Sequence, residues 1–449
     1  MKKVYLFNTL TSQKEEFKPL IENEVSIYYC GPTVYNYPHL GNMRTVVVFD
    51  LLARLLTELG YNVKMVRNYT DIDDKIINAA IAEGKTEKEI SDFYIKSYED
   101  TESKLNCLPL YAKPRVSETM DHIISFIETM IKENVAYKEG DDVYFDVTKD
   151  SKYGELSKMK LENLDDGNRV AKNLNKHNAQ DFVLWKLTSD NGIKFDAPFG
   201  RGRPGWHTEC VVMVNDVFKK PIIDIHGGGF DLKFPHHENE MAQSECVNHT
   251  TLAKYWMHVG FLNVNGEKMS KSLGNDLKAK DVISMYSGDA VRLFFYSSHY
   301  RSPLNFTDDN LKEAVNKVKK YQETIYKLHN KFELENLDYY SHAFLDETFD
   351  SFIDSLCDDL NVNNALVSVE KIVKDINQLT RKRDLDVKLL SANYNTLIKC
   401  MNLLGITYQL HEVTLQEKEL YLQYLNSKLE KDFETSDRLR KELIEKGLI

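Results

Sequence analysis

The sequence predicts an α/β fold in which a parallel-sheet domain is interrupted by an insertion and followed by an α-helical bundle and a short C-terminal segment. Three observations indicate this order. A strand, a turn, a helix and a second strand follow one another over residues 25–75, a stretch of different texture spans about 107–195, and helical periodicity begins near 310. A strand–helix–strand succession is the unit of parallel sheets. At roughly 150 residues per domain, the 449 residues allow about three domains.

The first half of the chain contains the elements expected in the sheet. They are, in order, a strand at 25–30, an apolar helix at 44–60 that ends at Gly60, a strand that begins at 61, and strands at 221–229 and 256–266. Between them, residues 107–195 combine short patches such as DDVYFDVTK with a polar loop, LENLDDGNRVAKNLNKHNAQ. We interpret residues 107–195 as an insertion into the sheet domain.

Four apolar stripes at helical spacing predict four amphipathic helices after residue 310, which is typical of a bundle. The stripes are Leu311, Val315, Val318, Tyr321, Ile325 and Leu328; Phe349, Phe352, Ile353, Leu356 and Leu360; Leu366, Val369, Val373, Ile376 and Leu379; and Leu390, Tyr394, Leu397, Met401 and Leu404. The charged stretch LEKDFETSDRLRKELIEKG predicts one more amphipathic helix near the C-terminus.

Composition excludes several classes of protein. No stretch approaches the roughly 18 consecutive apolar residues of a membrane span, and the N-terminus turns polar too soon for a secretory signal. Six scattered cysteines in a large chain of this kind are expected to be thiols or metal ligands rather than disulfides. With a net charge of −11, the chain can bind nucleic acid only through local basic patches. We expect a cytoplasmic protein with no membrane partner.

The stretch DIHGGGFDLKFPHHENEM (224–241) is dense in glycine, histidine and acidic residues. It suits a metal site, a nucleotide site or a polar turn before a helix. His236 and Glu240 are four residues apart and would share one face of a helix, whereas His237 and Glu238 would point elsewhere. Imidazole and carboxylate, with thiolate, are suitable zinc ligands. A zinc-protease motif would need a second histidine where the chain has Met241.

Two short motifs suit phosphate. HLGN (39–42) lies between a strand and a helix, where backbone N–H groups and the helix dipole favour an anion, although an ordinary turn would look the same. KMSKS (268–272) lies between two glycines, and Lys268 and Lys271 could reach a triphosphate, although a solvated basic loop is the alternative. The two motifs together, in this order, favour the nucleotide interpretation.

The sequence resembles the cysteinyl-tRNA synthetases, a family of class I aminoacyl-tRNA synthetases, over nearly its whole length. Seven stretches support the resemblance, and they occur in the family's order: YYCGPTVYNYPHLGNMRTVVVFD, VRNYTDIDDKI, DFVLWK, GRPGWHTEC, DIHGGGFDLKFPHHENEMAQSE, YWMHVGFLNVNGEKMSKSLGN and YRSPLNFTDDNL. The resemblance implies ATP-dependent ligation of L-cysteine to tRNA(Cys) through a cysteinyl-adenylate. It also implies a Rossmann-like catalytic domain in two halves (1–106, and 196–309 with the KMSKS loop), a connective insertion (107–195), a tRNA-binding helical bundle (310–410) and a short anticodon-binding segment (411–449).

Site residues follow from the family position by position. The implied ligands of one zinc ion per chain are Cys30, Cys210, His236 and Glu240; the implied catalytic residues are His39, Lys268 and Lys271; ATP would be bound by His39, Gly41, Asn42, Asp231 and Lys271; and cysteine would be bound by Thr70, Trp206 and His226. Mg²⁺ is expected with ATP, and a monomer is expected. The pairing of Cys30 with Cys210 rests on the resemblance alone.

The expected role of zinc is chemical selection. Cysteine and serine differ by sulfur for oxygen, which a pocket of fixed shape rejects poorly. A thiol, whose pKa is about 8.5, becomes a thiolate on the metal far more readily than a hydroxyl ionises. We therefore expect no editing site and a structural or acceptor-end role for the insertion. Four protein ligands and the substrate sulfur make five, so we expect Glu240 to bind weakly or to lengthen its bond.

The sequence departs from the family pattern at two places, and three alternative functions remain to be considered. The first signature ends in Asn42 rather than the second histidine common in the class, and the segment after 411 is expected to be small. The rivals are a cysteine–amino-sugar ligase of the mycothiol type, a non-catalytic paralogue that binds zinc or tRNA, and a zinc hydrolase. The long helical region favours tRNA over the amino sugar, the two phosphate-binding motifs argue against a non-catalytic paralogue, and the ligand spacing excludes the hydrolase.

Overall fold

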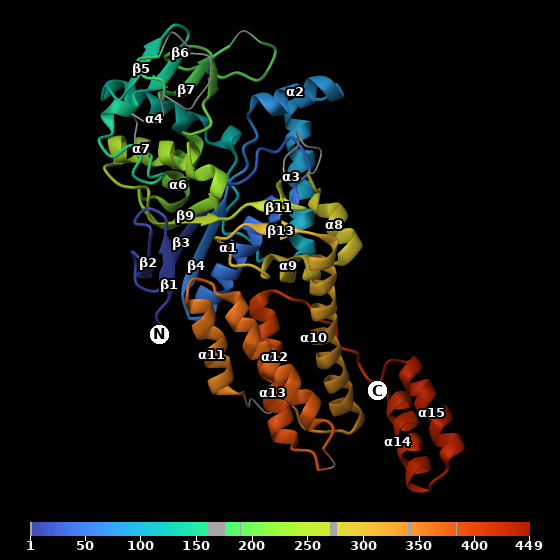
Figure 1. Cartoon of the computed structure of the whole chain (residues 1–449). Helices are drawn as coiled ribbons and strands as arrows, with labels where there is room; N and C mark the ends of the chain where they lie inside the picture. The colour runs from blue at the N-terminus through green and yellow to red at the C-terminus, as the bar shows by residue number, and fades with distance from the viewer. Residues whose placement is uncertain (1, 160–175, 189, 270–275, 340–343, 383) are drawn as a thin grey trace. The chain divides into compact units, whose positions relative to one another are not determined.

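A computed structural model of the chain describes residues 2–159, 176–188, 190–269, 276–339, 344–382 and 384–449. It divides into two compact units. The first comprises Met1–Met285 and Tyr300–Phe306, and the second comprises Tyr286–His299 and Thr307–Ile449. Figure 1 shows the chain coloured from blue at the N-terminus to red at the C-terminus.

A four-stranded parallel sheet forms the centre of the first unit, in the order β10-β9-β3-β4. Its strands are β3 (Glu24–Tyr29), β4 (Asn62–Arg67), β9 (Ile223–Gly229) and β10 (Ala253–Val259). The helix α1 (Leu40–Glu58) connects β3 to its parallel neighbour β4, as the strand–helix–strand pattern predicts. In a parallel sheet all carboxyl ends lie at one edge, so the segments that follow β3, β4 and β9 meet there.

The predicted helix and strands differ from the observed ones in their ends. The helix begins at Leu40 rather than 44, so HLGN is the cap and first turn of α1 and not a separate turn. The three glycines of 227–229 belong to β9, where a Cβ on Gly227 would lie 2.1 Å from the Met257 carbonyl oxygen of β10. The lack of a side chain at Gly227 therefore permits close pairing of β9 with β10. The strand expected at 256–266 is two strands, because β10 ends at Val259 and β11 (Leu262–Val264) joins another sheet.

The insertion contains its own antiparallel sheet, in the order β5-β6-β7-β8. These strands are Ala136–Glu139, Asp142–Phe145, Phe182–Leu187 and Gly202–Pro204, so the sheet extends beyond residue 195, where we placed the end of the insertion. It packs with α4 (Met120–Lys132), α6 (Glu209–Phe218) and α7 (His236–Asn248) in one hydrophobic core. The core fixes α6 and α7, which supply several candidate site residues.

Smaller elements complete the first unit. They are β1 (Tyr5–Asn8), β2 (Gln13–Glu16), α2 (Asp74–Glu83), α3 (Glu87–Lys104), η1 (Val116–Glu118), η2 (Val147–Lys149), η3 (Phe230–Lys233), β12 (Glu267–Lys268), β13 (Leu304–Phe306) and most of α8 (Ala279–Tyr286). The buried guanidinium of Arg44 on α1 donates hydrogen bonds to the carbonyl oxygens of Gly260, Phe261 and Ser302. These bonds tie the helix that begins at HLGN to the loop that leads into β11 and β12.

The second unit is helical. Its elements are α9 (Gly288–Phe295), α10 (Asp308–Leu334), α11 (Asp346–Cys357), α12 (Val362–Leu379), α13 (Val387–Leu404), α14 (Leu415–Leu429) and α15 (Phe433–Glu445). The four stripes after 310 correspond to α10–α13, and the charged stretch near the C-terminus corresponds to α15. The sequence did not predict α14, because its leucines 415, 422 and 429 are exposed and mark no buried stripe. No helix among the described residues has the length and apolar content of a membrane span.

Leu52→Ala should destabilise the first unit by about 2–5 kcal/mol, because Leu52 on α1 is fully buried and its truncation leaves a cavity. The three tryptophans, 185, 206 and 256, all lie in this unit, so their fluorescence during urea denaturation reports its unfolding. Ile81→Ala on α2 is the control, since Ile81 is exposed and its loss should change stability by less than about 0.5 kcal/mol. Equal effects of the two substitutions would contradict this packing.

Candidate metal centre and nucleotide pocket

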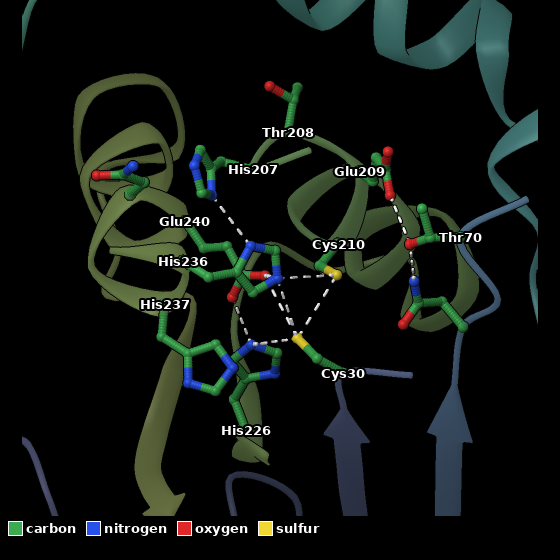
Figure 2. A network of polar contacts seen from close by, with 12 residues as sticks. Cys30, Thr70, His207, Thr208, Glu209, Cys210, His226, His236, His237 and Glu240 are labelled. Carbon is green, nitrogen blue, oxygen red and sulfur yellow. Dashed lines mark hydrogen bonds and ion pairs between the residues drawn. The ribbon is translucent and has the colours of Figure 1, made fainter. Parts of the chain in front are cut away.

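Four predicted ligands meet at the carboxyl edge of the parallel sheet (Figure 2). Cys30 directly follows β3, Cys210 lies in the first turn of α6, and His236 and Glu240 lie one turn apart on α7. The ligand atoms of all four lie within 4.8 Å of one another, and only Cys30 is more than slightly exposed. Residues 30 and 210, which the sequence could pair only by resemblance, are therefore neighbours in space.

The spacing of these atoms fits a tetrahedral ion. Bonds of about 2.0–2.3 Å to nitrogen, oxygen and sulfur place the ligands of a tetrahedral site about 3.3–3.8 Å apart. The Cys30 sulfur lies 3.6 Å from that of Cys210, 3.5 Å from His236 Nε2 and 3.5 Å from a Glu240 oxygen, and the Cys210 sulfur lies 3.8 Å from His236 Nε2. Only His236 and Glu240 are closer, at 2.8 Å, because they form an ion pair. Sulfur, nitrogen and oxygen donors at these distances can hold a metal.

The protonation of the cluster also suits a cation. Burial opposes the ionisation of Cys210, but the Cys30 thiol and the His236 imidazole outweigh it and lower its pKa to about 7. Burial, followed by the neighbouring Cys210 sulfur, raises the pKa of Cys30 well above its usual value. Burial opposes the ionisation of Glu240 as well, yet its two histidine neighbours hold its pKa well below the usual range. A thiolate and a carboxylate therefore share one buried site with His236, where burial opposes the charged imidazole but Glu240 and Cys210 raise its pKa to about 10, and a metal cation could replace that proton.

Two further histidines reach the same cluster. His226, the predicted cysteine-binding residue on β9, lies 2.6 Å from the second oxygen of Glu240 and 3.8 Å from the Cys30 sulfur. With His237, these residues form a second group close enough to hold an ion. The Nε2 atom of His237 is buried and has no hydrogen-bond partner among the described residues, whereas its Nδ1 lies 2.8 Å from His258. Helical spacing predicts that His237 points to a different face from His236, and this prediction is wrong for the cluster as a whole, because the ligand atoms of His237, His226, Cys30 and Glu240 lie within 4.8 Å of one another.

Trp206 covers the outer side of the cluster. Its ring is 41% exposed and stacks on the His236 imidazole, with centroids 4.2 Å apart. His207, which the sequence did not single out, lies with its Nδ1 3.1 Å from that of His236. Burial and the neighbouring His236 lower the pKa of His207 to about 3. A neutral His207 can thus fix the orientation of the His236 ring.

Thr70, also predicted to bind cysteine, is part of a second polar group beside the metal cluster (Figure 2). Its hydroxyl donates a 2.9 Å hydrogen bond to Glu209, the residue before Cys210. Burial, followed by the adjacent Cys210, raises the pKa of the Glu209 carboxyl well above its usual range, and the hydrogen bond from Thr70 opposes this only in part. Glu209 was missed in the sequence because GWHTEC contains no spacing signal for it. Its buried carboxyl is a candidate partner for a substrate ammonium group.

A cavity of about 240 Å³ adjoins the metal cluster and brings most of the predicted nucleotide-binding residues together. Its lining includes Cys30, His39, Gly41, Asn42, Asp231 and Lys268. Lys268 is in β12, with its ammonium nitrogen 4.4 Å from the centroid of the Phe261 ring. Lys271 lies outside the described residues. Cys30 is thus a wall of the cavity as well as a member of the metal cluster.

His39 caps the helix that points at this cavity. Its Nδ1 accepts a hydrogen bond from the Asn42 backbone N–H at 3.2 Å, and the Asn42 side chain accepts one from the His39 backbone at 3.1 Å. Neutral His39 then carries its proton on Nε2, the nitrogen that can donate to phosphate. A Cβ on Gly41 would lie 3.1 Å from the Met269 side chain and from the His39 ring, so the turn is tightly packed. Asn42, which stands where the class signature has a second histidine, therefore completes the N-terminal cap of α1.

The chain is similar to known tRNA synthetases over most of its length. Residues 16–316 match the family described as the tRNA synthetases class I (C) catalytic domain, and residues 351–409 match the DALR domain. The chain is 41% identical to the cysteine–tRNA ligase of Acholeplasma laidlawii and 39% identical to that of Fusobacterium nucleatum. The two alignments cover 99% of this chain and, respectively, 99% and 97% of those proteins.

Solved structures resemble the chain in fold. The methionyl-tRNA synthetase of Mycobacterium tuberculosis in complex with methionyl-adenylate aligns with a TM-score of 0.62 at 15% identity, covering 89% of this chain and 91% of that one. An arginyl-tRNA synthetase from Campylobacter jejuni, described as putative, aligns with a TM-score of 0.58 at 13% identity, covering 86% and 93%. At these identities the likeness concerns the fold alone.

Cys30→Ser should reduce the metal bound by the purified protein to well below one equivalent per chain, because one of four converging donors is replaced by a poorer one. Elemental analysis by mass spectrometry measures this. Cys246→Ser is the matched control, since Cys246 is a half-buried free thiol outside both ligand groups. Stoichiometric metal in the Cys30 variant, or equal loss in both variants, would contradict the assignment.

Proposed function

Because the chain belongs to the cysteine–tRNA ligase family of class I tRNA synthetases, we propose that it ligates L-cysteine to tRNA(Cys) at the expense of ATP, through a cysteinyl-adenylate. The observation that supports this most directly is the double position of Cys30. It belongs to a buried group of metal-ligating residues, and it lines the cavity that HLGN and Lys268 also line. The metal that would bind the substrate thiol and the cavity that would hold the ATP phosphates would thus lie on either side of Cys30.

We propose zinc as the ion held by Cys30, Cys210, His236 and Glu240. The mixed sulfur, nitrogen and oxygen donors suit zinc, and their distances fit its tetrahedral geometry. Bound zinc would supply a Lewis acid that prefers a thiolate to a hydroxyl, which separates cysteine from serine. Glu240 is the ligand whose bond to the metal would lengthen when the substrate thiolate binds. His226 already holds the second oxygen of Glu240 at 2.6 Å and can retain the carboxylate there.

The remaining pocket residues bind and orient cysteine in this proposal. Glu209, held by Thr70, would face the substrate ammonium, and Trp206 would cover the side chain from the solvent side. His226 would act on the substrate indirectly, by holding Glu240 and lying beside Cys30. With its ammonium and thiol fixed, the substrate carboxylate would be directed toward the nucleotide cavity that Cys30 also lines, which reduces the entropy lost in reaching the transition state.

Adenylate formation then follows from the cavity lining. The cysteine carboxylate attacks the α-phosphorus, the bond to the bridging oxygen breaks, and pyrophosphate leaves with Mg²⁺ as its counterion. His39 donates from Nε2 to a phosphate oxygen, Gly41 permits close approach of the nucleotide, and Asp231 accepts hydrogen bonds from it. Lys268 and Lys271 stabilise the charge that develops on the phosphates.

In the second step a hydroxyl of the terminal ribose of tRNA attacks the carbonyl carbon of the cysteinyl-adenylate. The ester bond to tRNA forms, the bond to the phosphate oxygen breaks, and AMP leaves.

The domain roles follow the same proposal. Residues 1–106 and 196–309 would form the catalytic domain, 107–195 together with β8 (Gly202–Pro204) the connective insertion, 310–410 the tRNA-binding bundle and 411–449 the anticodon-side segment. We also propose that the protein acts in the cytoplasm as a monomer. A cysteine–amino-sugar ligase is not favoured, because the chain matches the DALR domain and aligns with cysteine–tRNA ligases nearly end to end.

The purified protein should transfer labelled cysteine, but not serine, to tRNA(Cys) in the presence of ATP. Acid-precipitated radioactivity measures charging, and pyrophosphate exchange measures amino-acid activation separately. Removal of zinc should abolish cysteine activation, and restoring zinc should recover it. Normal exchange without charging would contradict tRNA as the acceptor, whereas charging with serine at a similar rate would contradict selection by the metal.

Lys271→Ala should lower the rate of adenylate formation about 100-fold or more while changing ATP affinity less than about threefold, because the lysine acts mainly on the transition state. Single-turnover kinetics and equilibrium ATP binding separate the two quantities. Lys149→Ala, in η2 of the insertion, removes a lysine outside the pocket and should change neither. Equal losses in rate and affinity would indicate ground-state binding only.

A further inference from the structure

Three aromatic rings gather on the surface beside the nucleotide cavity. Tyr37, Phe93 and Tyr94 pack edge to face, with centroids 5.1–6.0 Å apart. Phe93 is 53% exposed, and the two tyrosines are partly exposed. Part of their apolar and π surface is therefore open to solvent. An exposed aromatic group of this kind is more typical of a binding surface than of a folding nucleus.

Lysines surround these rings. The ammonium nitrogen of Lys280 lies 3.5 Å from the centroid of Tyr37, that of Lys278 lies 5.5 Å from the same ring, and that of Lys85 lies 5.9 Å from Phe93. Lys85 is also paired with Glu83 at 2.7 Å. Among the residues that the structure describes, no carboxylate lies within ion-pair distance of Lys278 or Lys280. The six residues Tyr37, Lys85, Phe93, Tyr94, Lys278 and Lys280 form what we call the aromatic–lysine cluster.

The aromatic–lysine cluster continues directly into the cavity wall. Tyr37 precedes His39 by two residues, and Leu40 is bonded through its backbone N–H to the Leu277 carbonyl at 2.8 Å. The Ala279 N–H donates to the Pro38 carbonyl at 2.9 Å, so the segment that carries Lys278 and Lys280 is joined to HLGN. On α3, Tyr94 lies one turn before Tyr98, which lines the cavity.

We propose that the aromatic–lysine cluster holds the unpaired 3′ end of tRNA next to the nucleotide cavity. Bases without a pairing partner stack on aromatic rings, and lysines neutralise the phosphates between them. A protein partner would not require unpaired lysines beside the rings, whereas a nucleic-acid strand requires both. The proposal rests on the proposed function, since that reaction brings the terminal ribose of tRNA into the cavity.

The test compares two RNAs: intact tRNA(Cys), and the same tRNA without its unpaired 3′ nucleotides. Phe93→Ala should weaken binding of the intact tRNA about 5- to 100-fold, the equivalent of losing one stacked base, and should leave binding of the truncated tRNA unchanged. Phe93→Tyr keeps a ring and should restore the affinity. Lys280→Ala should reduce the slope of log affinity against log salt by about 0.7 with the intact tRNA only.

Tyr111→Ala is the matched control, because Tyr111 is 59% exposed with Lys64 5.9 Å from its ring centroid, yet lies outside the cluster. It should affect neither RNA. Cysteine-dependent pyrophosphate exchange should remain at the wild-type rate in Phe93→Ala. Equal weakening with both RNAs, no weakening with either, or loss of exchange would overturn the proposal. Failure of the wild-type protein to charge tRNA with cysteine would instead overturn the proposed function, and the two failures are therefore distinguishable.

Discussion

The parallel arrangement of β9, β3 and β4 decides where the candidate groups of the first unit lie. Their carboxyl ends share one edge, and Cys30 follows β3, Thr70 follows β4, and Asp231 follows β9. Side chains that are far apart in sequence therefore become neighbours, and the Thr70 N–H also donates a hydrogen bond to the Pro32 carbonyl oxygen, which joins the segments that follow β4 and β3. Only α6 and α7 must be added to complete the metal centre, and the core shared with the insertion holds both helices in place.

The insertion also fixes α7, the helix that carries two candidate metal ligands, through a polar contact. Glu238, which lies between two candidate ligands on α7, accepts backbone hydrogen bonds from Gly154, Leu156 and Ser157. A fully buried carboxylate would cost several kcal/mol if it had no such donors. The contact holds Glu238 against the insertion, while His236, His237 and Glu240 remain beside the cluster. The insertion thus has a structural part in the site even though it contributes no candidate ligand.

The sequence predicted the parts of the site that depend on local spacing. His236 and Glu240 share a helix face, as four-residue spacing requires, and HLGN lies at the N-terminus of an apolar helix, although it forms the cap and first turn of that helix rather than a separate turn. Contacts across the fold could not be derived in this way. Cys30 and Cys210 are 180 residues apart, and Glu209 and His207 become recognisable only when burial brings them beside Thr70 and His236. The sequence did not predict α14 because few residues of this helix are buried, and its apolar residues therefore mark no buried stripe.

X-ray absorption at the zinc edge would test the central claim most directly, because it counts the sulfur atoms bound to the metal. Zinc held by Cys30 and Cys210 should have two sulfur neighbours in the free protein and three after L-cysteine is added. L-serine should leave the count at two. A count that stays at two with saturating cysteine would contradict selection of the substrate by direct coordination of its thiolate.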